Sequence, residues 1–164
     1  MTAPAPHSMA SWLPELEAAF EDTARGALGI EIVRVKARGG HPVASWQGAY
    51  LSLIGPGGAL QIGLAGDAKA CQTLAKGLLG LAPAEADLSA PEMADAFCEI
   101  VNIVAGAFKS RVRDRAPQLT MGLPTFFNGG VQETERTAVK VAEIEAGGHS
   151  AALLLVHPRG ASEA

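Results

Sequence analysis

The sequence predicts an α+β fold, in which an antiparallel sheet of about six strands packs against two long helices and one short helix. Two observations support this prediction. Helical and extended patterns come in separate runs, in the order helix, three strands, helix, helix, three strands, whereas a βαβ fold would alternate them. Clusters of glycine separate several of the strands, as expected for short turns between antiparallel neighbours.

The length and composition suit one globular domain. The chain has 164 residues, of which 48% are hydrophobic and 18% charged, so it can bury a core without disulfides or metals. We expect the domain to span residues 11–158. Residues 1–10 and 159–164 are expected to be disordered tails, because neither segment carries an apolar pattern.

The longest helical pattern runs from Ser89 to Arg113, and we expect the fold to be organised around it. At about 100° per residue its large apolar side chains fall on one stripe. We expect this stripe to be buried; its members are Met93, Phe97, Ile100, Val101, Val104, Phe108 and Val112. Ser89 and Glu92 have the spacing of a capping box, with Pro91 in the first turn, so the helix should begin near residue 90.

The remaining elements follow from apolar periodicity and from boundaries at glycine and proline. A first helix is expected to begin at Ser11, with the serine as its cap, and to end at Gly29. A short helix should run from Asp67 to Leu79. Strands are expected at residues 30–37, 43–54, 59–64, 118–128, 136–145 and 150–157. We expect the first three strands to form a meander.

Composition and charge argue against several classes of partner. A net charge of −4 and a pI near 5.5 disfavour nucleic acid, because phosphate binding needs a basic surface. No apolar run reaches the ~18 residues of a membrane span, and the N-terminus lacks the pattern of a signal peptide. We therefore expect a cytoplasmic protein that binds neither nucleic acid nor membrane.

The cysteines and histidines predict no metal site of the chain's own. Cys71 and Cys98 are too few and too far apart for a disulfide framework or a zinc site, and we expect them to be small buried hydrophobes. The histidines have no ligand-like spacing to one another or to the cysteines. They are His7, His41, His149 and His157.

The opposite stripe of the long helix carries polar residues that its stability does not need. The stripe consists of Asp95, Glu99, Asn102, Gly106, Lys109 and Arg113. Asn102 is a poor helix former in mid-helix, and Gly106 costs about 1 kcal/mol relative to alanine. The simplest interpretation is a solvated face with unremarkable polar residues. The alternative is a contact surface, because an amide can hold a water and a glycine lets another surface approach.

The pattern Asp95-x-x-x-Glu99-x-x-Asn102, followed by Gly106 and later by Pro124, resembles the signature of the CheC/CheX family of chemotaxis phosphatases. The chain is similar to CheX-type members over roughly residues 11–157, and it shows one such motif. The resemblance implies a CheC/CheX-like α+β fold. It also implies hydrolysis of the aspartyl phosphate on a phosphorylated CheY-like receiver domain of a response regulator.

The resemblance further implies a role for each residue of the motif. Asn102 would position the attacking water, and Glu99 would pair with a cation of the receiver, most plausibly its active-site lysine. Asp95 would pair locally or steer the receiver, Gly106 would permit close approach, and Pro124 would shape the adjacent strand end. The phosphatase would need no cofactor of its own, because the receiver supplies Mg²⁺.

Two other functions stay open at this point. The chain could be a non-catalytic module of the same fold that docks a receiver or a motor-switch component, or a purely structural subunit. CheX-type proteins resemble homodimers built by joining sheets, so we expect a homodimer. The apolar strand Ala151 to Val156 is a possible sheet edge for this contact, because it carries no charge to guard it.

Overall fold

The computed structural model describes residues 12–34, 46–56 and 58–159. The helices are α1 (Leu13–Thr23), continued by a π-helical turn η2 (Ala24–Leu28), α2 (Ala68–Leu79) and α3 (Ala90–Arg111). The strands are β1 (Ile32–Arg34), β2 (Gln47–Gly55), β3 (Gly58–Gly66), β4 (Thr120–Met121), β5 (Thr125–Asn128), β6 (Thr137–Ala146) and β7 (His149–Pro158). Several predicted features lie outside the described residues. They are the cap Ser11, His7 and His41, strand residues 35–37 and 43–45, and the segments 1–10 and 160–164.

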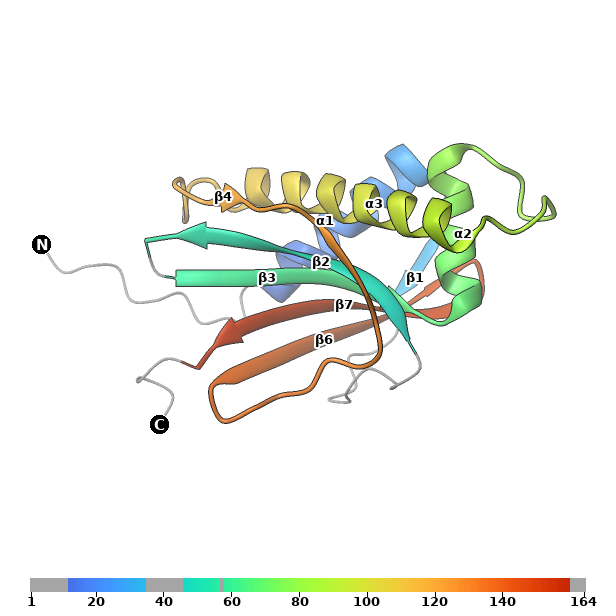
Figure 1. Cartoon of the computed structure of the whole chain (residues 1–164). Helices are drawn as coiled ribbons and strands as arrows, with labels where there is room; N and C mark the ends of the chain where they lie inside the picture. Colours follow the sequence, from blue (N-terminus) through green and yellow to red (C-terminus); the bar gives the residue numbers. More distant parts are fainter. Residues whose placement is uncertain (1–11, 35–45, 57, 160–164) are drawn as a thin grey trace, which may run out of the picture.

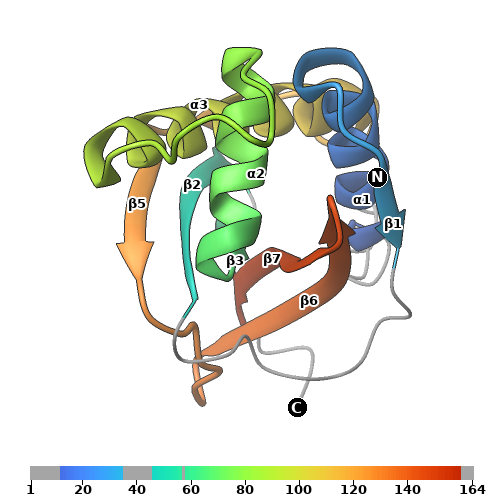
Figure 2. The same ribbon diagram turned by 90° about the vertical axis from the view of Figure 1, so that its right-hand side faces the viewer.

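The strands form one antiparallel sheet, as the sequence predicts. Their order is β1-β6-β7-β3-β2-β4, and β5 also pairs with β2. Because β4 and β5 occupy the same edge, seven strands fill six positions across the sheet. Figures 1 and 2 show α1 and α3 over one face of this sheet, with α2 at one end. The α+β prediction is therefore confirmed.

The predicted meander of the first three strands is wrong. β2 and β3 form the expected hairpin, but β1 lies at the far edge of the sheet and pairs with β6. The reason is that β2 has β3 on one side and β4 and β5 on the other, so that no side of β2 is left for β1. Pairing between distant segments, and not chain order, places β1.

The predicted edge strand is also wrong, because β7 lies between β3 and β6. Its apolar run reflects burial on both faces of the sheet, since Leu153 and Leu155 join the main core while Leu154 joins a second cluster. A dimer that joins two sheets must therefore use β1, or else β4 and β5.

The predicted strand at residues 118–128 is broken into β4 and β5. Gly122 donates its amide to the Ser52 carbonyl at 2.7 Å, and Pro124 has no amide to continue the ladder. The break leaves a short irregular segment, residues 122–124, between two strands that both pair with β2, and this segment runs alongside α3 at the edge of the sheet (Figure 1). The strand that follows this segment is anchored by Phe126, whose ring meets the Phe97 ring of α3 edge-on, with 6.4 Å between the ring centroids.

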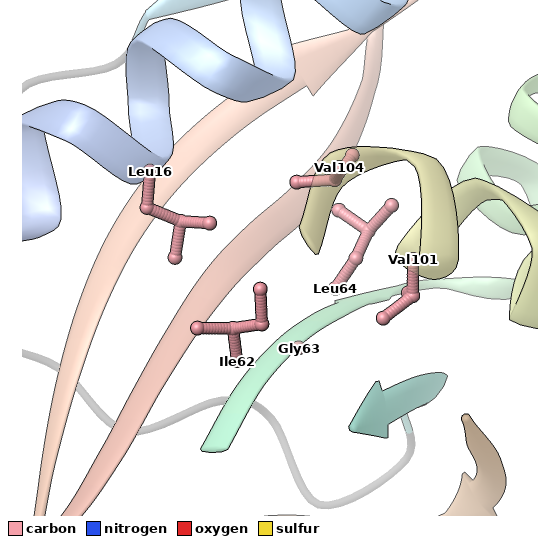
Figure 3. Close-up of a pocket in the computed structure, with 6 residues that line it drawn as sticks. All are labelled: Leu16, Ile62, Gly63, Leu64, Val101 and Val104. Atoms are coloured by element: carbon pink, nitrogen blue, oxygen red, sulfur yellow. The ribbon is translucent and has the colours of Figure 1, made fainter. Parts of the chain in front are cut away.

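The inner stripe of α3 forms the centre of the core, as predicted. All seven of its predicted apolar residues are buried. Figure 3 shows Val101 and Val104 of α3 facing Leu16 of α1 and Ile62 and Leu64 of β3, and the gap between them has no room for a water molecule. Tight packing on this side fixes the rotation of α3 about its own axis.

The helix ends follow the local signals in the sequence, with α1 as the exception. Asp67 caps α2 by accepting a hydrogen bond from the Ala70 amide at 2.7 Å, and Gly80 ends it in a left-handed conformation. Ser89 and Glu92 form the expected capping box of α3. The N-cap of α1 is Trp12, which makes no side-chain cap bond, because an indole has no acceptor to offer the first amides of the helix.

The connection from α2 to α3 is held by two side chains of α2. Lys76 is buried, and its ammonium group donates to the Glu85 carbonyl at 2.7 Å and to the Asp87 carboxylate at 2.8 Å. The Gln72 amide both accepts from and donates to the backbone of Leu88, at 2.9 and 3.0 Å. These bonds fix the chain immediately before the first turn of α3.

The described chain extends one residue into the predicted C-terminal tail. Arg159 donates its backbone amide to the Arg136 carbonyl at 2.9 Å, and its guanidinium lies 3.3 Å from the Glu133 carboxylate. These contacts join Arg159, which follows β7, to the loop before β6.

Candidate functional site

The outer face of α3 carries the predicted site residues on a rigid element. Asp95 and Glu99 are exposed, and Asn102 is half-buried. Their directions follow from the buried stripe, because a helix whose inner face is fixed must turn these positions outward. The structure thus brings Asp95, Glu99 and Asn102 onto one continuous surface, as the spacing predicts.

These polar groups are not engaged with the rest of the described chain. The Asn102 amide makes no hydrogen bond to a described residue, and Glu99 forms no ion pair with one. The local ion pair that the sequence left open for Asp95 is likewise not formed with any residue in the described ranges. The three side chains are therefore available for a partner or for water.

Nothing in the packing of the described chain requires a glycine at position 106. A Cβ atom built on Gly106 would meet nothing within 4 Å, whereas one built on Gly77 of α2 would lie 2.8 Å from the Leu28 carbonyl oxygen. Gly77 is required because η2 packs closely against it. Packing therefore explains the glycine at position 77 and not the one at position 106. The open space above Gly106 leaves room for another surface one turn from Asn102.

Pro124 lies in the irregular segment between β4 and β5, next to a residue whose exposure the sequence did not reveal. Leu123 is 88% exposed, although leucine normally contributes to a core. The strand pattern predicted a continuous strand here, so no sequence signal marked Leu123 as protruding. This segment adds an apolar side chain to the edge of the sheet that flanks α3.

The two cysteine thiols are protonated at neutral pH. Burial raises the pKa of Cys71 to about 12, and the nearby Asp67 carboxylate adds to the effect. Partial burial also raises the pKa of Cys98, with a smaller contribution from Asp95. Cys71 is fully buried, as predicted, whereas Cys98 is half-buried. Neither thiol has the lowered pKa that a cysteine nucleophile needs.

The other face of the sheet carries a groove with a different character. Its volume is about 280 Å³. It is lined by Tyr50, Gln61, Ile62, Gly63, Phe127, Asn128, Gly130, Val131, Leu154 and Val156. No Asp, Glu, Lys, Arg, His or Cys is among these residues, so the groove offers no group suited to acid–base work at neutral pH.

The described residues hold neither a cluster of metal-ligating side chains nor a helix that could span a membrane. No cluster of three or more His, Cys, Asp and Glu side chains comes together in the described ranges. None of the helices there combines the length and the apolar character needed to cross a membrane. The exposed face of α3 is therefore the best candidate for a functional surface among the residues that the structure describes.

Comparison with known protein families decides the relationship of this chain. The family model described as chemotaxis phosphatase CheX matches residues 49–145, which is more than half of the sequence. The chain belongs to the CheX family. The matched region contains all of α3 and also Pro124, so every predicted site residue of this CheX family member falls inside it.

Solved structures share the fold of this CheX family member at low sequence identity. Chemotaxis protein CheX from Vibrio vulnificus is 15% identical with a TM-score of 0.72, over 92% of this chain and 99% of that one. CheX in a complex with CheY, BeF3 and Mg²⁺ from Borrelia burgdorferi is 14% identical with a TM-score of 0.65, over 91% and 98%. FliY from Thermotoga maritima is 15% identical with a TM-score of 0.62, over 96% and 92%. No curated protein sequence matches the chain.

Proposed function

We propose that this CheX family member hydrolyses the aspartyl phosphate of a CheY-like receiver, with Glu99 and Asn102 on α3 as its site. One observation carries the proposal. The Asn102 amide, free of hydrogen bonds to described residues, lies one turn from the exposed Glu99 carboxylate on a helix whose rotation is fixed by a packed core. The family match supports the reaction class.

Hydrolysis of the aspartyl phosphate needs few catalytic groups from the phosphatase itself. An acyl phosphate is already reactive, and the receiver's own Mg²⁺ and lysine hold the phosphoryl group, so the missing contribution is a water placed in line with the phosphorus. A carboxamide suits this task, because it donates to and accepts from a water without changing its charge. Asn102 therefore acts by orienting the water.

Glu99 supplies the docking contact in this proposal. Side chains three residues apart on a helix have Cβ atoms about 5–6 Å apart, so a receiver cation bound by Glu99 lies next to the Asn102 amide. Pairing Glu99 with the receiver lysine would thus bring the water site and the phosphoryl group together in one step. Asp95 adds negative charge one turn earlier and helps to steer the receiver toward α3.

The choice of partner is supported by a structural neighbour. The fold of this chain is shared with a CheX protein that was solved together with CheY, BeF3 and Mg²⁺. The described residues of this chain form no cluster of carboxylates that could hold Mg²⁺. We therefore assign the Mg²⁺ to the receiver, and Gly106 and Pro124 to the surface that the receiver approaches.

The direct test is the lifetime of the phosphoryl group on a panel of phosphorylated CheY-like receivers. The native protein should shorten this lifetime for at least one receiver at a catalytic ratio of phosphatase to receiver. The double variant Glu99→Ala/Asn102→Ala, which keeps the inner face of α3 intact, should leave it unchanged. Equal lifetimes with the native protein and the double variant across the panel would contradict the proposal.

A non-catalytic receiver-binding module is the second candidate. It stays open because the likeness to solved structures, at 14–15% identity, shows the fold of this chain and not its activity. The two candidates differ in one measurement. Tight binding of a phosphorylated receiver without loss of phosphate selects the binding module, whereas turnover selects the phosphatase.

A further inference from the structure

We propose that Lys109 and Arg113 form a second ionic contact with the receiver, on the far side of Asn102 from Glu99, which fixes the direction in which the receiver lies along α3. This inference rests on the proposed function, because the receiver is its partner. It adds two specificity-determining residues that bind an acidic region of the receiver surface.

The structure divides the cations at the end of α3 into two pairs. Arg111 binds Glu15 at 3.0 Å and Asp22 at 3.2 Å, both on α1. Arg115 binds Glu15 at 2.7 Å and lies over the Trp12 ring. These two arginines join α3 to α1, so their charges are already compensated within the fold.

The other two cations are not compensated in this way. Neither Lys109, in the last turn of α3, nor Arg113, just past its end, forms an ion pair with a residue in the described ranges. Arg113 is exposed and Lys109 half-buried. A helix C-terminus favours a cation nearby, and both Lys109 and Arg111 lie in the last turn of α3. Lys109 and Arg113 thus carry charge that no side chain in the described ranges neutralises.

The spacing places Lys109 in line with the site. Asp95, Asn102 and Lys109 follow one another at intervals of seven residues, so their directions differ by only about 20° per step and each step rises roughly 10 Å. Glu99 and Lys109 are roughly 15 Å apart along the axis. The surface of α3 therefore changes from negative to neutral to positive, with the open space above Gly106 between the last two.

This order of charges distinguishes the two directions in which a receiver could lie. With its lysine at Glu99, a receiver that presents an acidic group toward Lys109 gains a second attraction. The reversed direction places like charges together, which is unfavourable. Because the Asn102 water must be in line with the phosphorus, only one direction can be productive.

The test measures binding to a receiver loaded with beryllofluoride and Mg²⁺, so that no turnover is needed. Lys109→Glu/Arg113→Glu should raise the Kd about tenfold at low ionic strength, and the deficit should shrink at high salt. The neutral variant Lys109→Gln/Arg113→Gln should show a smaller effect in the same direction. The matched control is Lys69→Glu. Lys69 is exposed in the first turn of α2, where the helix dipole favours a negative charge, so this variant should bind the receiver as the native protein does.

A charge exchange sharpens the result. One substitution of an exposed acidic residue of the receiver by lysine should restore affinity for Lys109→Glu/Arg113→Glu while weakening the native protein. An unchanged Kd for this double variant at low salt, with its melting temperature preserved, would overturn the inference. Native protein that binds the loaded receiver but hydrolyses none of its phosphorylated form overturns the proposed function alone, because the binding measurement stands apart from turnover.

Discussion

The two faces of α3 belong to one helix of 22 residues, but they have different surroundings. The inner face consists of buried side chains that pack against α1, β2 and β3, and it leaves no room for water. The outer face carries Glu99 and Asn102, which make no contact of their own with a described polar partner. The comparison shows that the inner face determines where the outer face points.

This division separates stability from function on a single helix. Substitutions on the inner face change the free energy of unfolding, because they remove packed apolar volume. Substitutions on the outer face remove no packed volume, so they change that free energy through helix propensity alone, by about 1 kcal/mol or less. The following predictions test this separation.

The largest effect on stability is expected for Phe97→Ala. Phe97 is fully buried and its ring meets Phe126, so its loss leaves a cavity between α3 and β5. We expect a decrease of about 3–5 kcal/mol in the free energy of unfolding, measured by denaturant titration. Leu123→Ala, which truncates a side chain that is 88% exposed, is the control and should change stability by less than about 0.5 kcal/mol. A loss below 1 kcal/mol for Phe97→Ala would refute the assignment of the inner face.

Glu99→Ala should weaken receiver binding without unfolding the protein. If Glu99 pairs with a receiver cation at a partly desolvated interface, its removal should cost on the order of 1–3 kcal/mol of binding free energy. The loss of turnover should shrink when the receiver is in excess. Titration calorimetry checks the affinity, with Glu135→Ala, an exposed acid in the loop before β6, as the control. Equal affinity for the native protein and Glu99→Ala would remove Glu99 from the contact.

Ser89→Ala should destabilise the fold by about 1 kcal/mol, because it removes the N-cap of α3. Ser89 donates from both its backbone amide and its hydroxyl to the Glu92 carboxylate, at 2.9 and 2.6 Å. These bonds lower the pKa of Glu92, so their contribution is present at neutral pH and is lost as the pH falls through that lowered pKa.

The difference in stability between native protein and Ser89→Ala should therefore narrow in acid. Thermal unfolding at neutral pH, and in acid below the lowered pKa of Glu92, measures this difference. Ser110→Ala, at the opposite end of α3, where the hydroxyl donates back to the Gly106 carbonyl, should show no such narrowing. A constant difference across the pH range would argue against the Glu92 bonds.

The smallest effect is expected for Gly106→Ala. Nothing lies within 4 Å of the added Cβ atom, so the substitution should raise stability by up to about 1 kcal/mol through helix propensity alone. Gly77→Ala should instead destabilise, because its Cβ would press on the Leu28 carbonyl. Receiver affinity should fall for Gly106→Ala if the receiver approaches this turn. Unchanged affinity would show that the glycine serves no partner.

Local patterns predicted α3 well. The buried stripe, the capping box and the outward direction of Asn102 all follow from spacing within one helix, so no distant contact was needed to predict them. The same holds for α2, whose cap Asp67 and terminal Gly80 act within a few residues. Whether Glu99 and Asn102 carry a reaction stays a prediction, because the structure shows their direction and not their chemistry.

Contacts between residues far apart in the chain could not be predicted from the sequence. The position of β1 depends on the free side of β6, and the central place of β7 depends on both of its neighbours. The bonds from Lys76 to the connection before α3 were not predictable, because exposed and buried lysines look alike in a sequence. Likewise, the split of the terminal cations of α3 depends on Glu15 of α1, nearly a hundred residues away.

The most direct test of the account is a set of three measurements on Asn102→Ala: free energy of unfolding, receiver affinity and maximal rate of dephosphorylation. Asn128→Ala, at the end of β5 and away from α3, is the matched control. We expect stability that is unchanged or slightly higher, affinity within a few tenths of a kcal/mol of the native value, and a maximal rate lower by on the order of a hundredfold. Full activity in Asn102→Ala, or loss of its fold, would contradict the claim that this exposed amide orients the attacking water.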